Sequence, residues 1–193
     1  MTSRPERPIA LFDMDGTLAD YDGRLQRDLD RIAGPNDPPF NVYSNDPTPE
    51  YITRRRHVIT SQAEWWENLE PLQSGFEIFD LCDELGFKNI ILTKGPSSKP
   101  FAWSEKVNWC NIHLGSLPNG ITLTHDKSLV YGKLLVDDWP EYIERWLKWR
   151  PRGLAIMPTN PRNIGFTHPN VIPYSGNVLE LQAIRERLTL HRG

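Results

Sequence analysis

The chain has 193 residues, of which 38% are hydrophobic and 24% are charged, and its formal net charge is −3. This size and composition are typical of one well-buried globular domain. The small negative charge gives no electrostatic basis for stable binding to nucleic acid or to a membrane surface. No apolar run is long enough to span a bilayer, and residues 1–7 lack the apolar core of a secretory signal, so we expect a cytoplasmic protein.

The first predicted element is a strand over residues 9–12, an ungapped apolar run that suits a strand buried on both faces. Asp13 and Asp15 follow it directly, and Gly16 then allows a tight loop. Ligands of open α/β sheets bind outside the carboxyl ends of the strands, which is where these two carboxylates lie. Such a pair suits a hard cation such as Mg²⁺, although an isolated Asp-x-Asp is also typical of a solvated turn.

Residues 20–73 show little strand character. Leu25, Leu29 and Ile32 fall on one face of a predicted helix. The stretch 35–49 holds five prolines and is predicted to be irregular. We therefore expect this segment to form a small helical cap over the strand ends.

Helical character returns over residues 50–69. Arg54-Arg55-Arg56 is interpreted as an exposed helix face. Ser61 and Glu64 match a capping box, which predicts a helix start just before two tryptophans.

Strands and helices alternate over the rest of the chain. Ser74 and Glu77 match a second capping box and predict a helix start. Further strands are expected at residues 89–92, 121–124, 134–136, 154–157 and 171–172, and further helices at 74–85, 100–113, 141–149 and 178–188. This order predicts an α/β fold, a three-layer α/β/α Rossmann-like core with a mostly parallel sheet. The core would comprise residues 1–19 and 74–193, with residues 20–73 as the cap.

Polar side chains of complementary chemistry follow several predicted strands. They are Asp13, Asp15, Thr93, Lys127, Asp137 and Asp138. Phosphoryl transfer needs a nucleophile, a proton carrier and positive charge around the phosphate oxygens. A carboxylate can act as the nucleophile through an aspartyl-phosphate intermediate. Mg²⁺, a hydroxyl and an ammonium group can surround the phosphate oxygens. The set therefore predicts a phosphoryl-transfer site.

Other interpretations of the acidic motif fit less well. An EF-hand loop starting at Asp13 would need glutamate at its twelfth position, which is Arg24. No glycine-rich nucleotide loop follows a strand, and the five histidines have no metal-ligand spacing. Cys82 and Cys110 also lack such spacing and are predicted to be buried or free thiols.

The motifs resemble those of a known superfamily. Asp13-Met14-Asp15-Gly16-Thr17 resembles the first motif of haloacid dehalogenase-like phosphatases, and Thr93, Lys127 and Asp137-Asp138 resemble the second, third and fourth. More narrowly, blocks of sequence resemble the 5′(3′)-deoxyribonucleotidase family; they lie at residues 13–21, 69–72, 101–106, 123–127 and 138–140 and, more weakly, at 158–161.

The resemblance implies catalytic and metal-binding roles. Asp13 would be the nucleophile, and Asp15 would protonate the leaving nucleoside oxygen and then activate water. Mg²⁺ would be held by Asp13, by the backbone carbonyl of Asp15 and by Asp138. Asp137 would support Lys127 from outside the metal's ligand set.

The resemblance also implies how the substrate is bound. Thr93 and Lys127 would bind phosphate oxygens, and Tyr21 would contact the nucleoside. Lys94 stands where the family tends to carry a small residue, so it adds a phosphate contact or favours a different substrate. On chemical grounds alone, since bases stack on aromatic faces, further candidates are Phe40, Tyr43, Trp65 and Trp66. The two tryptophans are equally compatible with a place in the core.

The leading hypothesis is a Mg²⁺-dependent phosphatase acting on (deoxy)nucleoside monophosphates. A second hypothesis is a related phosphatase for another small phosphate ester or for a nucleic-acid 3′-phosphate end. A third, of another class, is a phospho-accepting or nucleotide-binding regulatory domain without turnover. Aromatic residues exposed on the cap would be compatible with a homodimer.

Overall fold

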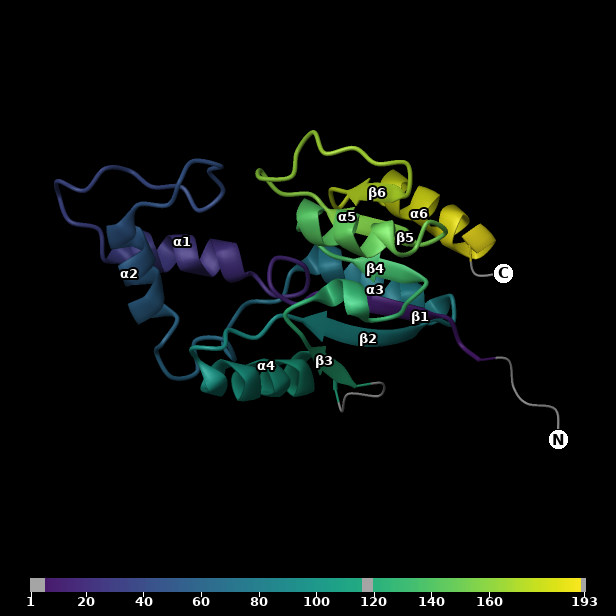
Figure 1. The fold of residues 1–193 in the computed structure, drawn as a ribbon, viewed down its shortest axis with the longest axis horizontal. Helices are drawn as coiled ribbons and strands as arrows, with labels where there is room; N and C mark the ends of the chain where they lie inside the picture. The colour runs from purple at the N-terminus through teal and green to yellow at the C-terminus, as the bar shows by residue number, and fades with distance from the viewer. Residues whose placement is uncertain (1–5, 116–119, 192–193) are drawn as a thin grey trace.

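The computed structural model describes residues 6–115 and 120–191 (Figure 1). The strands are β1 (Ile9–Phe12), β2 (Lys88–Thr93), β3 (Ile121–Leu123), β4 (Leu134–Val136), β5 (Leu154–Pro158) and β6 (Val171–Tyr174). The helices are α1 (Tyr21–Arg31), α2 (Glu50–Ile59), α3 (Gln73–Glu84), α4 (Pro100–His113), α5 (Pro140–Lys148) and α6 (Val178–His191), and a short 3₁₀ helix, η1, spans Lys127–Leu129.

The six strands form one sheet in the order β3-β2-β1-β4-β5-β6, and every pair is parallel. The predicted α/β fold is therefore confirmed. Strand β1 lies between β2 and β4, with Leu11 opposite Ile90 and Leu135. Because all strands run the same way, their carboxyl ends meet at one edge of the sheet. This edge faces α1 and α2 in Figure 1.

Side chains alternate between the two faces of the sheet, as the pleat requires. Phe12 of β1 belongs to a hydrophobic cluster with residues of α3, α4 and α6, whereas its neighbour Leu11 packs in a second cluster with residues of α5. Helices thus cover both faces and bury the central strands completely. Cys82 and Cys110 lie in the first cluster as free thiols, as predicted. No helix in the described residues is long and apolar enough to cross a membrane.

We call residues 20–73 the cap. Its helix α2 ends at Ile59 and residues 60–68 form turns, so the second helix, predicted to start just before Trp65, was wrong. Ser61 does not cap a helix, because its hydroxyl donates to the carbonyl of His57 at 2.6 Å. Glu64 has a positive φ of 60° and donates its backbone N–H to the carboxylate of Glu105 at 2.9 Å. The backbone N–H of Glu64 is thus bound by Glu105 of α4, and not by a capping residue within its own segment.

The second capping box was also wrong. Helix α3 begins one residue earlier, at Gln73, and its N-cap residue Leu72 makes no side-chain cap. Glu77 instead accepts hydrogen bonds from Gln73, at 2.9 Å, and from Tyr174. In this first turn the helix backbone packs closely on the loop after β1, where a Cβ on Gly75 would lie 2.0 Å from the carbonyl oxygen of Thr17.

Helix α4 joins the cap to the core. The ammonium group of Lys99 donates to the carbonyl of His57 at 2.9 Å and to the hydroxyl of Thr60. The carboxylate of Glu105 also accepts the backbone N–H of Trp66 at 3.1 Å. These contacts hold the cap's last turns against α4.

Candidate active site

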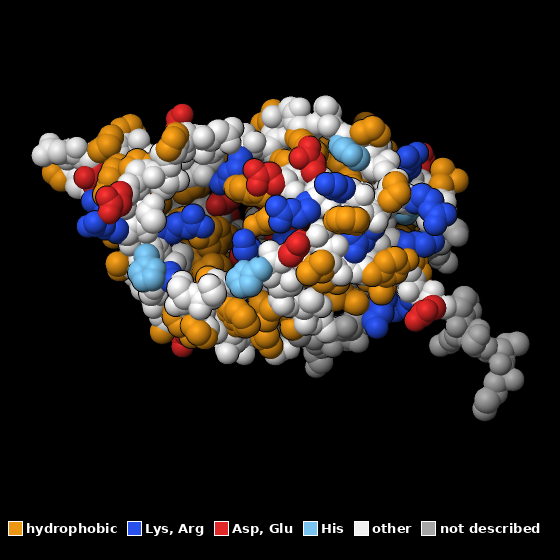
Figure 2. Space-filling view, viewed as in Figure 1, with side chains coloured by type: hydrophobic (Ala, Val, Ile, Leu, Met, Phe, Trp, Pro, Cys, Tyr) orange, Lys and Arg blue, Asp and Glu red, His pale blue; other side chains and the backbone are white. Residues whose placement is uncertain are grey.

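A cavity of about 620 Å³ lies between the cap and the carboxyl ends of the strands. Figure 2 shows it as a central hollow with charged side chains at its walls. Its core wall includes Asp13, Asp15, Lys94, Lys127 and Asp138, and its cap wall includes Tyr21, Phe40, Arg56 and Trp66. The structure therefore brings together most of the site residues that the sequence predicts.

Three buried carboxylates gather at the ends of β1 and β4. One oxygen from each of Asp13, Asp137 and Asp138 lies within 4.8 Å of the others. The ammonium group of Lys127 lies 2.7 Å from both Asp13 and Asp137. Burial alone would lower the pKa of Lys127, but these two carboxylates raise it above its usual value, so the side chain stays protonated. Lys127 thus neutralises part of this acidic cluster.

Asp138 is the third carboxylate of this cluster. Burial, followed by the neighbouring charges of Asp137 and Asp13, raises the pKa of Asp138 well above its usual value. Asn160 donates to its Oδ2 at 2.9 Å and fixes its orientation. A Cβ on Gly16 would lie 2.6 Å from the same oxygen, so only glycine fits there.

These features fit a divalent cation. Carboxylate oxygens are the donors that Mg²⁺ prefers, and a cation would relieve the repulsion between buried like charges. The cluster of carboxylates that could hold the cation contains Asp13, Asp137 and Asp138. The Asp15 side chain is not in it, and its backbone carbonyl remains the predicted ligand.

Asp15 is paired with a lysine that the sequence interpretation did not assign to the site. The fully buried Lys106 of α4 donates to Asp15 Oδ2 at 2.6 Å. Its other two hydrogen bonds go to the Thr93 hydroxyl at 3.0 Å and to the carbonyl of Lys94 at 2.9 Å. Burial raises the pKa of Asp15, and Lys106 opposes that shift. Asp15 Oδ1 is buried and has no hydrogen-bond partner among the described residues, so this oxygen is left for a ligand.

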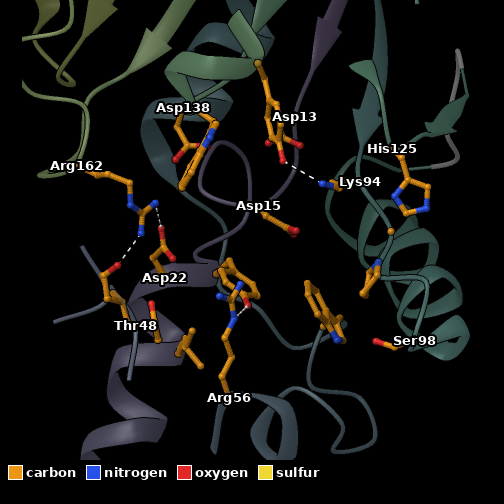
Figure 3. Close-up of a pocket in the computed structure, with 18 of the residues that line it drawn as sticks. Asp13, Asp15, Asp22, Thr48, Arg56, Lys94, Ser98, His125, Asp138 and Arg162 are labelled. Carbon is orange, nitrogen blue, oxygen red and sulfur yellow. Dashed lines mark hydrogen bonds and ion pairs between the residues drawn. The ribbon is translucent and has the colours of Figure 1, made fainter. Parts of the chain in front are cut away.

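The predicted phosphate-binding groups lie around these acids. The side chain of Thr93 is fully buried at the end of β2, where Lys106 orients its hydroxyl. Lys94 donates to the hydroxyl of Tyr142 at 3.3 Å, and the ring of Tyr142 also lies 4.9 Å from the Lys127 ammonium. Figure 3 shows Lys94 at the same end of the cavity as Asp13.

The five aromatic candidates are not equivalent. Tyr21 and Phe40 line the cavity, and Trp66 lines it in place of Trp65. Trp65 is 2% exposed and donates its indole N–H to Asp28 at 2.8 Å, so the structure places it in the core of the cap. Tyr43 is not in the cavity wall and packs beside a guanidinium group, whose carbon lies 5.6 Å from its ring centre.

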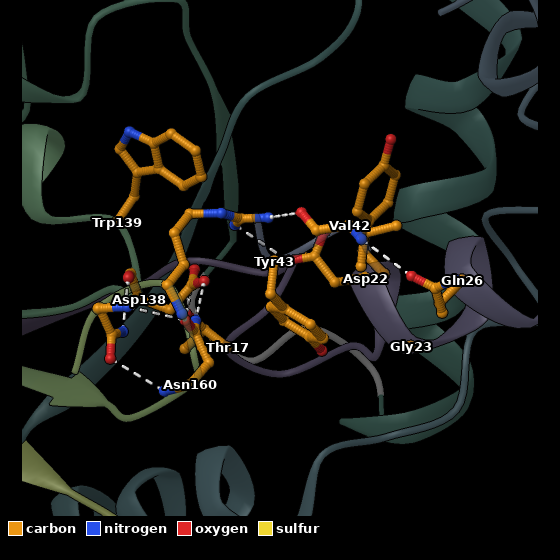
Figure 4. Close-up of polar contacts among 12 residues, drawn as sticks. Thr17, Asp22, Gly23, Gln26, Val42, Tyr43, Asp138, Trp139 and Asn160 are labelled. Atoms are coloured by element: carbon orange, nitrogen blue, oxygen red, sulfur yellow. Dashed lines mark hydrogen bonds and ion pairs between the residues drawn. The ribbon is translucent and has the colours of Figure 1, made fainter. Parts of the chain in front are cut away.

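That guanidinium belongs to Arg162, which joins the core to the cap. Figure 4 labels the residues around it, among them Asp22, Val42 and Trp139. It lies in the loop after β5, and its Nη1 is 3.2 Å from Asp22 of α1. Its Nη2 donates to the carbonyl of Val42 at 2.7 Å, and its carbon lies 4.7 Å from the ring centre of Trp139. Arg162 thereby fixes one side of the cavity.

The buried acids lead to a prediction about stability. Both Asp137, whose pKa is raised to about 6, and Asp138 titrate above their ordinary value of 3.8. In that interval the folded protein binds more protons than the unfolded chain, so the free energy of unfolding falls as the pH rises. We expect the melting temperature in EDTA to fall as the pH rises from about 4 to about 6, and Asp138→Asn to reduce the fall. A melting temperature that rises over this interval would contradict the assignment.

Comparison with known proteins first defines the class. A haloacid dehalogenase-like family hydrolase from Xanthomonas campestris superposes with a TM-score of 0.54 at 14% identity, over 94% of this chain and 100% of the other. At this identity the likeness establishes the fold, which is that of the haloacid dehalogenase-like hydrolases.

Sequence comparison then gives the family. The family model "5′ nucleotidase, deoxy (Pyrimidine), cytosolic type C protein" matches residues 7–174, and the chain belongs to this family of hydrolases. The human cytosolic 5′(3′)-deoxyribonucleotidase is 29% identical over 66% of this chain and 69% of its own length. The mouse mitochondrial 5′(3′)-deoxyribonucleotidase is 31% identical over 68% of this chain and 64% of its own. The predicted resemblance is confirmed, and the protein is an enzyme of the phosphatase type.

Proposed function

We propose that the protein is a Mg²⁺-dependent phosphatase that hydrolyses (deoxy)nucleoside monophosphates through an aspartyl-phosphate. The observation that carries the proposal is the placement of the buried Asp13 in the core wall of the cavity, between Lys127 and the carboxylate of Asp138. Family membership supports the substrate class. When bound at Asp13, Asp138 and the Asp15 carbonyl, Mg²⁺ would neutralise the negative charge that keeps an anionic nucleophile and an anionic phosphate apart.

In the first step an oxygen of the Asp13 carboxylate attacks the phosphorus atom. The bond from phosphorus to the nucleoside oxygen breaks, and protonated Asp15 donates its proton to that oxygen. The raised pKa of Asp15 favours the protonated form that this step needs. Thr93 and Lys127 bind the phosphate oxygens during the transfer.

In the second step water attacks the phosphorus of phospho-Asp13. Asp15, now a carboxylate, takes the proton from the water, and phosphate leaves. Both carboxyl groups return to their starting forms, and one ester and one water have become one alcohol and one phosphate. Lys106 holds Asp15 in place through both steps.

Three further expectations stand as part of this proposal. Residues 20–73 act as a cap on a core of residues 1–19 and 74–193. The enzyme works in the cytoplasm on small nucleotides, without stable binding to nucleic acid. It is compatible with a homodimer, which light scattering would detect.

Phosphate release from ribo- and deoxynucleoside 5′- and 3′-monophosphates tests the proposal. We expect release from some nucleotides with Mg²⁺, and a loss of at least about a hundredfold in EDTA. Release from an aryl phosphate but from no nucleotide would keep the chemistry and reject the substrate class. No release from any ester would favour a domain that binds without turnover.

A further inference from the structure

Four cationic side chains line the cavity, and they differ in what balances their charge. Lys127 is paired with Asp13 and Asp137, and Arg162 with Asp22. The other two, Arg56 and Lys94, make no ion pair with any carboxylate in residues 6–115 and 120–191. Burial raises the pKa of Asp22 and Arg56 is near enough to oppose that shift, but the direct partner of Asp22 is Arg162, so Arg56 and Lys94 can each still pair with a bound anion.

These two cations belong to different walls. Lys94 directly follows Thr93 at the end of β2, so it lies with the groups that bind the reacting phosphate. Arg56 belongs to α2 and reaches the cavity from the cap. Figure 3 shows it across the cavity from Asp13 and Asp138. A ligand group that meets Arg56 is thus a different group from the phosphate at Asp13.

Arg56 is held in position by aromatic residues. Its Nε donates to the hydroxyl of Tyr21 at 2.8 Å, and its guanidinium carbon lies 5.4 Å from the centre of that ring. Tyr21 in turn stacks on Trp66, with 5.2 Å between ring centres. The two terminal amino groups of Arg56 have no acceptor in the part of the chain that the structure describes. The guanidinium is therefore oriented, with most of its donors unused.

The chemistry of these donors indicates the ligand. A guanidinium only donates, and its planar fork matches two oxygens of one phosphate better than the single carbonyl of a neutral base. Provided that the proposed nucleotidase function holds, we infer that Arg56 binds a second phosphate of the substrate. The favoured substrate class is then nucleoside 3′,5′-bisphosphates, with one phosphate at Asp13 and the other beyond the sugar, at the cap.

Kinetics with matched substrates test this inference. We compare kcat/KM for thymidine 3′,5′-bisphosphate with the values for the 5′- and 3′-monophosphates. We expect the bisphosphate to be favoured by about tenfold or more, and Arg56→Gln to bring the ratio close to one. Arg56→Lys should keep part of the preference. Arg54→Gln is the matched control, because Arg54 lies on the same helix and pairs with Glu50; it should keep the wild-type ratio.

Equilibrium binding separates this inference from the proposed function. Calorimetry on the Asp13→Asn protein, with and without Arg56→Gln, compares the Kd of the bisphosphate with that of the 5′-monophosphate. Tighter bisphosphate binding that depends on Arg56 supports the second phosphate site even if no nucleotide is hydrolysed. Equal affinities, or an Arg56→Gln loss that is the same for both ligands, would overturn it and leave Arg56 as a support for Tyr21.

Discussion

Replacing Asp13 with asparagine should lower kcat for phosphate release by about a thousandfold or more. The amide keeps the size of the carboxylate but lacks a nucleophilic oxygen, so the first step fails. The fold should survive, because Lys127 keeps its contact with Asp137 at 2.7 Å and one of three crowded buried carboxylates loses its charge. Steady-state kinetics in saturating Mg²⁺ measure the first effect, and thermal unfolding measures the second.

Asp46→Asn provides the matched control for this variant. Asp46 is an exposed residue of the cap loop that accepts a hydrogen bond from Ser44. The same chemical change there should leave kcat unaltered. If Asp13→Asn keeps more than about a tenth of the wild-type kcat, Asp13 is not the nucleophile.

The core of the fold and its catalytic edge could be predicted because their signals are local. Short apolar runs such as residues 9–12 and 134–136 mark buried parallel strands, and the polar residue after each run must lie at the common carboxyl edge. This pattern predicts that Asp13, Thr93 and Asp138 lie at that edge. Each of them lies there in the structure.

The contacts between the cap and the core could not be predicted, because they join residues distant in sequence. Lys106 lies inside a helix, where a lysine is usually solvated, and its burial is explained by partners distant in sequence, Asp15 and Thr93. Arg56 is exposed, as the run of three arginines predicts, but that pattern did not indicate that its side chain also lines the cavity. The Ser61 and Glu64 pattern was locally sound, but the carboxylate of Glu105 took the backbone N–H groups of the turn. In the sequence, Lys106 belongs to the block of residues 101–106 that resembles the 5′(3′)-deoxyribonucleotidase family, and no other pattern pointed to it.

Replacing Lys106 with methionine should lower kcat by about a hundredfold, the scale of general acid–base catalysis by one positioned group. Methionine fills similar space but leaves Asp15 without its 2.6 Å partner and Thr93 without its donor. Because Lys106 opposes the burial that raises the pKa of Asp15, its loss should raise that pKa further. The carboxylate form that activates water then appears only at higher pH. The acidic limb of the profile of kcat against pH should therefore shift to higher pH.

The pH profile distinguishes this role from a packing role. Lys106→Arg should keep the limb nearer its wild-type position, and Asp15→Asn should abolish turnover because the titrating group is removed. Lys88→Met, at an exposed position on β2, is the control and should change neither kcat nor the limb. A fall in kcat at all pH values with an unmoved limb would show that Lys106 only fills space and orients Thr93. An upward shift would identify Lys106 as the group that sets the proton affinity of Asp15, and so the pH range in which one carboxyl group serves as acid and then as base.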